Sequence, residues 1–335
     1  MKARTVTVKR VTGADVAIHA GVSRTLVSYV LNDTPGKSIP LATRVKVLNA
    51  AQELGYLPNS AARALKTGRG YIVLLVIPQG PHGPHVYETT EALAISLAAR
   101  GYSLVVMTDR EQIDIPLLLD SLAPAATIVL AEIRQHNYDA LSQRAAAFLD
   151  FREWMAAPEL QDRSLEAGRL QVEYLASLGH RKLAIVTTTH PQLQRYAMPR
   201  TQEAQDAADR LGVELTVLRA LEPGSETIGQ ALTTFRDRGI TGVCAYNDMF
   251  ALGVLSHAYR LGIRVPDDLS LLGVADIPEA GLACPPLTTF RTDNSAIALR
   301  ILRMVLPLLQ EPDDVVLSSE PLMHIIERNS ARYLL

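Results

Sequence analysis

The stretch that decides the fold of the N-terminal region is Ala20-Gly21-Val22-Ser23-Arg24-Thr25. Ahead of it, Thr12 and Asp15 predict the start of a helix, because a threonine caps the first turn and a carboxylate is favourable at its positive end. Gly21 allows the left-handed conformation that ends such a helix sharply. Ser23 then predicts the cap of a second helix. The sequence therefore predicts two short helices joined by a tight turn.

The second helix has two different faces. Its apolar face carries Leu26, Val27, Val30 and Leu31, and its polar face carries Arg24, Thr25, Ser28 and Tyr29. A third helix, predicted over 41–54, is expected to direct Leu41, Val45, Leu48 and Ala51 toward the same core. A short helix that presents hydrogen-bond donors from a small core has the geometry of a recognition helix, whose first residues meet base edges in the DNA major groove. A helical bundle that binds protein is the alternative on these residues.

Charge separates this head from the rest of the chain. Residues 1–70 carry 11 Lys and Arg against 3 Asp and Glu, a net charge of +8, whereas residues 71–335 carry 22 against 32, a net charge of −10. A basic head on an acidic body is typical of a polyanion-binding module joined to a larger soluble domain. A solvated basic segment without a partner would give the same counts.

Buried-strand patterns alternate with amphipathic helices from Tyr71 onward. The strands are predicted at 72–77, 103–107, 127–130, 183–187, 214–218, 242–245 and 270–273. The predicted helices between them include 86–100, 165–178, 202–211, 228–238 and 250–261. Repeated strand–helix units predict parallel sheets covered on both faces, and their number predicts two subdomains.

Several features narrow the class of protein. Cys244 and Cys284 form no disulfide framework, which fits a reducing compartment. The start of the chain does not resemble a signal peptide and no apolar run is long enough to span a bilayer, so we expect a cytoplasmic protein without a membrane partner. His82 and His85 are too few to bind a metal. Because neither a catalytic triad nor a nucleotide-binding fingerprint occurs, we expect no enzyme activity and no cofactor.

The ordered motifs of the chain resemble the lactose-repressor family of bacterial regulators. In the head these motifs are Asp15-Val16-Ala17, Ala20-Gly21-Val22-Ser23, Val27-Ser28, Val30-Leu31-Asn32, Gly55-Tyr56 and Pro58-Asn59. In the body they are Leu178-Gly179-His180-Arg181-Lys182, Tyr246-Asn247-Asp248-Met249, the run 261–269 and Pro285-Pro286-Leu287-Thr288-Thr289. The resemblance implies a small all-α helix-turn-helix head and an α/β body, similar to periplasmic binding proteins, with two parallel-sheet subdomains. It implies a sequence-specific DNA-binding transcription regulator, expected to be a repressor.

The resemblance also implies an organisation of the chain. It comprises a flexible N-terminus over 1–10, a helix-turn-helix domain over 11–58, a hinge helix and linker over 59–70, an N-terminal effector subdomain over 71–161 plus 292–320, and a C-terminal effector subdomain over 162–291 plus 321–335. In the family, dimers form through the body, and the helices at 86–100 and 295–309 are the candidates here. The expected partners are a palindromic double-stranded DNA operator, a second copy of the chain and a small-molecule effector, sugar-like or otherwise. The protein would associate with the nucleoid when it occupies its operator.

The DNA contacts carry over by position. Those implied in the major groove come from Thr12, Ser23, Arg24, Thr25, Ser28, Tyr29 and Asn32. Those implied for the hinge helix in the minor groove come from Asn59, Ala62, Arg63, Leu65 and Lys66. Arg24 and Thr25 occupy the positions of the base-contacting pair, and Leu65 that of a wedge between base pairs. Tyr29 replaces the arginine usual in the family, which predicts a different operator preference.

The effector contacts are implied at Arg195, Asn247 and Asp276. From its local pattern Asn247 also reads as a turn residue, and Asp248 is expected to cap the next helix. Ala275 replaces the first of two acidic residues usual in the family, so the effector is expected to differ from a typical free sugar, or sensing to be lost. The alternatives are a solute-binding protein with a basic head, an activator and an effector-independent regulator.

Overall fold

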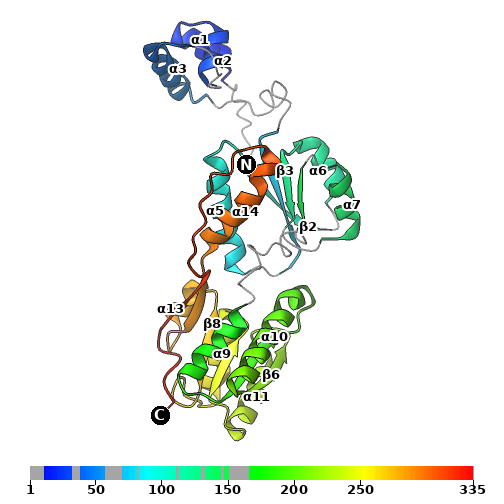
Figure 1. Ribbon diagram of the computed structural model, residues 1–335, viewed down its shortest axis with the longest axis vertical. Coiled ribbons are helices and arrows are strands. Elements are labelled where there is room, and N and C mark those ends of the chain that lie inside the picture. The colour runs from blue at the N-terminus through cyan, green and yellow to red at the C-terminus, as the bar shows by residue number, and fades with distance from the viewer. Residues whose placement is uncertain are drawn as a thin grey trace, which may run out of the picture. The chain divides into compact units, whose positions relative to one another are not determined.

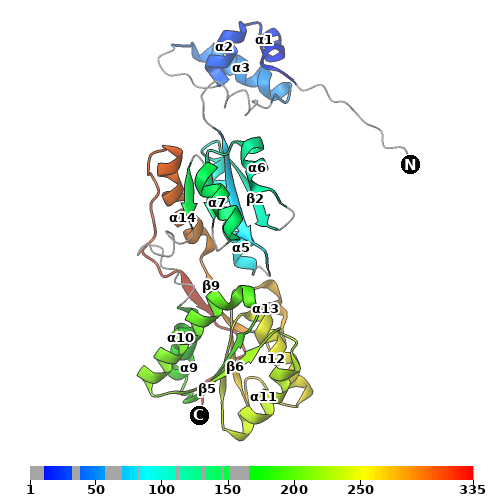
Figure 2. The same ribbon diagram turned by 90° about the vertical axis from the view of Figure 1, so that its right-hand side faces the viewer.

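The structure is a computed structural model that describes residues 11–31, 38–56, 70–80, 83–110, 113–129, 133–144, 147–150 and 166–334. The chain divides into two compact units, Met1–Tyr71 and Ile72–Leu335, called here the head and the body. Figures 1 and 2 show the helices of the head and the two sheets of the body from two directions. The predicted flexible segment at 1–10 lies outside the described residues.

The helices described in the head are α1 (Gly13–Ala20), α2 (Arg24–Leu31) and α3 (Leu41–Glu53). α1 begins in a capping box, in which the Asp15 N–H donates to the Thr12 hydroxyl (3.4 Å) and the Thr12 N–H donates to the Asp15 carboxylate (2.8 Å). Gly21 follows α1 at φ +59°. At the start of α2 the Leu26 N–H donates to the Ser23 hydroxyl (3.2 Å). The predicted turn and both predicted caps are therefore present.

The face of α3 that enters the core is not the predicted one. The side chains of Leu41, Val45 and Leu48 are 76%, 46% and 47% exposed. Of the four predicted residues only Ala51 is in the core, where it packs with Val47, Ala50 and the buried residues of α1 and α2. Both sets recur at helical spacing, so the pattern alone did not separate them. The small alanines let α3 approach the other two helices closely, and this packing selects their face.

The first sheet of the body has the strand order β2-β1-β3-β4 and is parallel throughout its described residues. Its strands are β1 (Ile72–Pro78), β2 (Ser103–Asp109), β3 (Ala126–Val129) and β4 (Phe148–Asp150). On one side of it lie α5 (Pro84–Ala98) and α14 (Asn294–Leu309), and on the other lie α6 (Ile115–Leu122) and α7 (Gln135–Arg144), as Figure 1 shows. Both faces are thus covered, as a parallel sheet requires.

The second sheet has the order β10-β9-β8-β7-β5-β6. Its strands are β5 (Lys182–Thr188), β6 (Glu214–Ala220), β7 (Gly242–Ala245), β8 (Ser270–Val274), β9 (Thr288–Thr292) and β10 (Met323–Ile326), of which only β10 is antiparallel to its neighbour. Its helices are α9 (Ala167–Ser177), α10 (Gln194–Leu211), α11 (Glu226–Asp237), α12 (Asp248–Arg260) and the short α13 (Pro278–Leu282), with a 3₁₀ turn at Pro191–Leu193. α9 and α10 enclose one core layer, whereas α11 and α12 enclose the other (Figure 2).

The predicted fold class is confirmed, and each predicted strand is present, the one at 242–245 with the predicted bounds and the others with bounds shifted by one or two residues. The strands that were not predicted are β4, β9 and β10. β4 and β10 are only 3 and 4 residues long. β9 reads as polar because Thr288 and Thr289 are in it, yet both are buried within the sheet. The proposed subdomain boundaries stay predictions.

Close packing of α9 on α10 requires Gly168. A Cβ atom added there would lie 2.1 Å from the carbonyl oxygen of Arg200. Replacing glycine by alanine inside a helix normally stabilises by about 0.5–1 kcal/mol. We expect Gly168→Ala instead to lower the free energy of unfolding by about 1–3 kcal/mol, because the backbone of α10 must move. Denaturant unfolding measures this change, with Gly224→Ala as the control because no heavy atom lies within 4 Å of that added Cβ. A stabilised Gly168→Ala protein would contradict the packing.

Candidate nucleic-acid interface and ligand site

The start of α2 directs polar side chains into solvent. Arg24 and Thr25 are exposed, Ser28 and Tyr29 are half-buried, and Val27 anchors the opposite face in the core. No described residue forms an ion pair or hydrogen bond with the Arg24 guanidinium, and α2 has no acidic residue in its first turn. The planar donor group of Arg24 therefore stands at the N-terminus of a helix whose orientation is set by a cap and a packed core. This arrangement suits a bidentate contact to a guanine edge.

The other predicted DNA-contact residues differ in how far the structure describes them. Thr12 and Ser23 are both helix caps, and the Thr12 hydroxyl also donates to Asp15 (2.7 Å). Their hydroxyls are thus engaged in fixing the two helices. The residues that lie outside the described part of the chain are Asn32, Asn59, Ala62, Arg63, Leu65 and Lys66. The minor-groove role of the hinge stays a prediction.

In the body, Asn247 and Asp248 follow β7 at the edge where the parallel strands end. Asn247 caps α12, because the Phe250 N–H donates to its side-chain oxygen (3.0 Å). The prediction that Asp248 provides this cap is wrong. Asn247 has the extended backbone of a capping residue, whereas Asp248 is already the first residue of the helix.

The Asp248 carboxylate is fully buried and connects three segments. It accepts hydrogen bonds from the Ile277 N–H (2.9 Å) and the Thr289 hydroxyl (2.6 Å). Gly273 permits this approach, since a Cβ there would lie 2.0 Å from Asp248 Oδ1. Burial raises the pKa of Asp248, the two hydrogen bonds lower it, the nearby charge of Asp276 raises it, and the net shift is upward.

Asp276, the third implied effector residue, already has partners. Its Oδ1 accepts a hydrogen bond from Arg328 (2.7 Å), and its Oδ2 lies 3.9 Å from Arg291. Asp276 has φ +53° and the preceding Ala275 has φ +119°. A non-glycine residue in such a backbone conformation destabilises the fold by about 1–3 kcal/mol. Residues of this kind are typical of ligand-binding and switch segments. The segment after β8 is therefore both strained and restrained by two arginines.

A guanidinium that sequence reasoning missed lies at the same edge. The carbon at the centre of the Arg200 guanidinium is 4.9 Å from the centroid of the Tyr246 ring, and Nη1 donates to the Tyr246 carbonyl directly after β7. Helical spacing could have found it, because Arg200 is one turn from Ala204, which faces the core with 0% exposure. Arg195, the residue implied by resemblance, lies in the first turn of α10. The side chain of Arg195 is outside the description.

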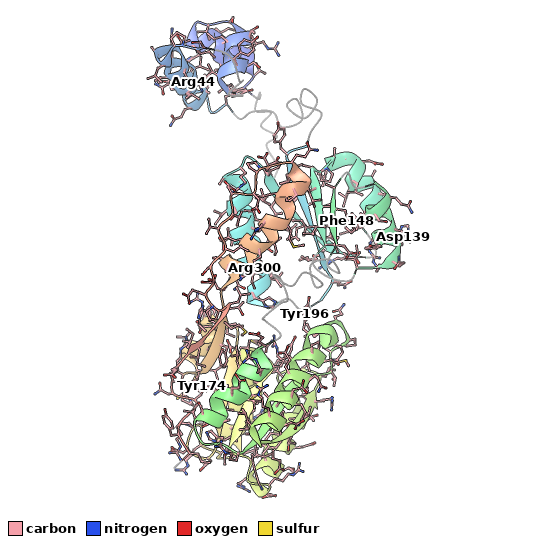
Figure 3. The ribbon with its side chains drawn as sticks, in the orientation of Figure 1. Arg44, Asp139, Phe148, Tyr174, Tyr196 and Arg300 are labelled. Atoms are coloured by element: carbon pink, nitrogen blue, oxygen red, sulfur yellow. The ribbon has the colours of Figure 1, made fainter. Side chains whose placement is uncertain are left out.

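The corresponding edge of the first sheet carries its own polar cluster. Arg134 donates from its backbone and its side chain to the buried Asp109 carboxylate, with N···O distances of 2.8–3.1 Å, and Asn137 donates to the same group (2.5 Å). Burial raises the pKa of Asp109, but the hydrogen bonds and charge of Arg134 outweigh it and lower that pKa overall. Nearby, the Tyr138 hydroxyl donates to Asp150 (2.9 Å), and the Tyr138 ring packs edge-on against Phe148, which Figure 3 labels.

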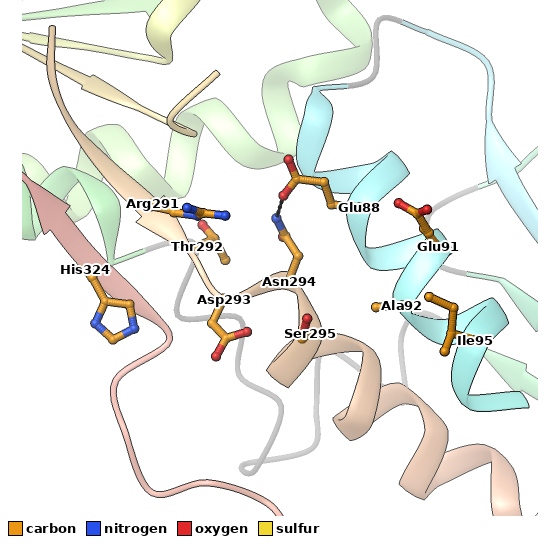
Figure 4. Close-up of a pocket in the computed structure, with 10 residues that line it drawn as sticks. All are labelled: Glu88, Glu91, Ala92, Ile95, Arg291, Thr292, Asp293, Asn294, Ser295 and His324. Atoms are coloured by element: carbon orange, nitrogen blue, oxygen red, sulfur yellow. Dashed lines mark hydrogen bonds between the residues drawn. The ribbon is translucent and has the colours of Figure 1, made fainter. Parts of the chain in front are cut away.

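A polar pocket of about 500 Å³ lies between α5 and the segment that joins β9 to α14, as Figure 4 shows. Asn294 connects its two walls, since its amide donates to Glu88 (2.6 Å) and its oxygen accepts from Thr89 (3.3 Å). Arg291 lines the pocket and is also the second partner of Asp276. The pocket and the strained segment after β8 are therefore joined by one side chain.

Among the residues that the structure describes, no group of three His, Cys, Asp or Glu side chains could bind a metal ion, and His82 is outside the description. None of the helices described there has the length and apolar character needed to cross a bilayer.

Comparison with known proteins matches both units. A family model described as bacterial regulatory proteins of the lacI family matches residues 13–59, and one described as a periplasmic binding protein-like domain matches residues 172–331. The chain is 27% identical over 319 residues to the HTH-type transcriptional repressor PurR of Pasteurella multocida (strain Pm70), an alignment that covers 90% of this chain and 92% of that relative.

Two solved structures show the same fold. The lac repressor dimer bound to operator and the anti-inducer ONPF is 23% identical with a TM-score of 0.70, over 97% of this chain and 100% of that one. The transcriptional regulator CelR in complex with cellobiose is 24% identical with a TM-score of 0.60, over 96% and 100%. The order of head and body in the matches is the order that the sequence predicts.

The buried Asp248 makes stability depend on pH. A carboxyl whose pKa is raised on folding contributes stability that is present below its unfolded pKa of about 4 and is lost as the pH rises through the folded pKa. Asp248→Asn removes this contribution together with its pH dependence. The free energy of unfolding of the wild type therefore falls as the pH rises above about 4, whereas that of the variant does not share this decrease. We expect the difference between the two proteins to become smaller over this range.

Denaturant unfolding between pH 3.5 and 7 measures this difference. Asp237→Asn, at an exposed position near the end of α11, controls for general effects of removing one charge. A stability difference between wild type and Asp248→Asn that is independent of pH would contradict the burial effect.

Proposed function

The chain belongs to the lactose-repressor family of bacterial regulatory proteins, and from this premise we propose that it represses transcription by binding a palindromic operator as a dimer. The observation that carries the proposal is the start of α2, where Arg24 and Thr25 are exposed on a helix with a capped start and a buried opposite face. The net charge of +8 on residues 1–70 supplies attraction to phosphates. The relatives named above are regulators rather than enzymes. A repressor of this kind acts in the cytoplasm, on nucleoid DNA.

Direct reading of bases rests on Arg24. An arginine that contacts a guanine bidentately contributes about 1–3 kcal/mol of discrimination against other bases. Tyr29 offers one hydroxyl and an apolar ring in place of a second guanidinium, so the half-site differs from that of members with arginine there. Ser28 and Asn32 are proposed to contact the phosphate backbone, and the hinge residues to contact the minor groove. These contacts would fix the position of the head on the duplex.

A single recognition helix reads only a few base pairs, so two-fold dimers gain affinity from two half-sites. The body offers α5 for the dimer, because Tyr87 and Ile95 on it are 67% and 66% exposed. The other predicted helix, α14, is less available, since Ile301, Leu302 and Val305 are buried within the body. We therefore propose α5 as the dimer helix of the subdomain that contains the first sheet.

A small-molecule effector is proposed to bind at the carboxyl ends of the strands, the edge at which ligands bind in parallel α/β sheets. Arg200 is the strongest candidate contact in the second sheet, together with the predicted Arg195, Asn247 and Asp276. Binding there would alter the angle between the subdomains and, through the hinge, the affinity for the operator. The methyl side chain of Ala275 cannot accept hydrogen bonds from hydroxyls, which argues against the usual sugar chemistry.

One set of contacts favours a second candidate function, an effector-independent regulator. The side-chain oxygen of Asn247 is used as a helix cap, and the Asp276 carboxylate is bound by Arg328. A ligand would have to compete with both. An operator affinity that no fraction of a metabolite extract changes would favour this second function.

Arg24→Ala tests base reading. We expect it to weaken binding of operator fragments, selected from genomic DNA by the wild type, by about 10-fold or more per half-site. Binding to scrambled DNA at low salt should remain, because phosphate contacts supply it. Fluorescence anisotropy with both DNAs over a range of salt concentrations measures the two affinities.

The matched control is Arg236→Ala, which removes an exposed arginine from α11 in the body. It should leave operator affinity unchanged. Equal losses by Arg24→Ala on operator and scrambled DNA would show that Arg24 does not read bases.

Ile95→Asp tests the dimer helix. A buried carboxylate at the interface would be strongly unfavourable, so we expect the variant to sediment as a monomer where the wild type is dimeric. Operator affinity should fall with it, because the second half-site is no longer linked. Leu211→Asp, at a 42% exposed position at the end of α10, is the control. A variant as dimeric as the wild type in analytical ultracentrifugation would refute the role of α5.

A further inference from the structure

A second pocket lies on the flank of the second sheet, between α10 and the edge strand β6. It has a volume of about 280 Å³, which is below the usual range of drug-sized sites and suits a single metabolite. Figure 2 shows α10 and β6 beside each other. Val217 and Arg219 are alternate residues of β6 and so project to the same side, the side that α10 leaves partly uncovered. We call this site the β6 pocket.

The glutamine amides that line the β6 pocket donate hydrogen bonds to other groups of the protein. Gln194 donates to the Thr188 carbonyl (2.7 Å), Gln202 to Asp206 (2.8 Å) and Gln205 to Asp209 (2.8 Å). Gln202 and Gln205 each use one of their two amide N–H groups in this way, and no described residue donates a hydrogen bond to the side-chain oxygen of any of the three glutamines. Carbonyl oxygens bind groups that donate. The walls of the pocket therefore favour a ligand that carries hydroxyls.

Among the side chains that line the β6 pocket, the charged one is Arg219. Arg219 is exposed and makes no ion pair with a residue that the structure describes, while no carboxylate is among the lining side chains. Three acids of α10 lie close to these residues in the chain but do not line the pocket: Asp206 and Asp209 accept from the two glutamines, and Glu203 directly follows Gln202. An arginine without a carboxylate partner provides a fork of donors for a carboxylate or phosphate. The ligand should therefore be anionic.

We propose that the β6 pocket binds a small hydroxylated anion, a sugar acid or sugar phosphate. The pocket begins at the carboxyl ends of β5 and β6, and its lining does not include Arg200, Asn247 or Asp276, the effector contacts proposed above. Arg219 would bind the anionic group, and the glutamine oxygens would accept from the hydroxyls. Thr187 and Thr201 are hydrogen-bonded to each other (3.2 Å) at the inner wall and set its width. The proposal goes beyond the DNA-binding function and does not depend on it.

Isothermal titration of the full chain tests the proposal. The probes are D-glucose 6-phosphate and D-gluconate, which carry both hydroxyls and an anionic group. D-Glucose, which has the hydroxyls alone, and inorganic phosphate, which has the anionic group alone, are the two half-ligands. We expect one or both hydroxylated anions to bind, and each half alone to bind at least tenfold more weakly. Arg219→Ala should weaken binding at least tenfold, and Gln205→Leu several-fold, because each removes one of the proposed contacts.

Matched controls locate the ligand. Arg238→Ala removes an exposed arginine outside the pocket and should leave affinity unchanged. Thermal unfolding verifies that each variant is folded. The proposal is overturned if neither anion binds the wild type, or if phosphate alone binds as tightly as the sugar phosphate. It is also overturned if Arg219→Ala binds normally while Arg200→Ala does not, since the ligand would then occupy the effector site proposed above.

Discussion

Apart from the antiparallel edge strand β10, the described strands of both sheets of the body run parallel, and a parallel sheet must be covered on both faces. Each strand therefore returns through a helix, and all carboxyl ends of the parallel strands gather at one edge. At that edge of the second sheet lie Arg200 with Tyr246, Asn247, Asp248 and Asp276. Residues that are up to 76 positions apart in the chain become neighbours for this one reason. Sheet topology, rather than any short sequence motif, thus brings the residues of the candidate ligand site together.

The polar groups at this edge largely satisfy one another. Asp248 is buried without a cation and depends on two donors from the segments after β8 and in β9. Asp276 is bound by Arg328 in a segment with two left-handed residues. Such an arrangement is stiff, and a ligand gains little unless it replaces an existing bond. This gives a physical reason why the body can differ in ligand chemistry from relatives whose fold it shares.

The places where sequence reasoning failed share a cause. Leu41, Val45 and Leu48 have the spacing of a core face, but the alanines of α3 pack inward instead. Asp248 is a good capping residue, yet Asn247 has the required backbone. In each case two readings satisfied the local pattern, and the choice depended on packing partners far away in the chain. The same holds for β9, whose buried threonines read as polar until their sheet neighbours are known.

By itself, the sequence determined what depends on neighbouring residues. Side chains within four positions of one another determine the capping box at Thr12, the left-handed turn at Gly21 and the cap at Ser23. The helix-turn-helix, the alternation of strands and helices and the family could likewise be predicted from patterns along the chain. Tertiary structure decided which guanidinium meets the strand ends, where Asp248 is buried and that the β6 pocket exists. Those features depend on the direction in which helices pack on a sheet, and burial and hydrogen bonding across the chain set that direction.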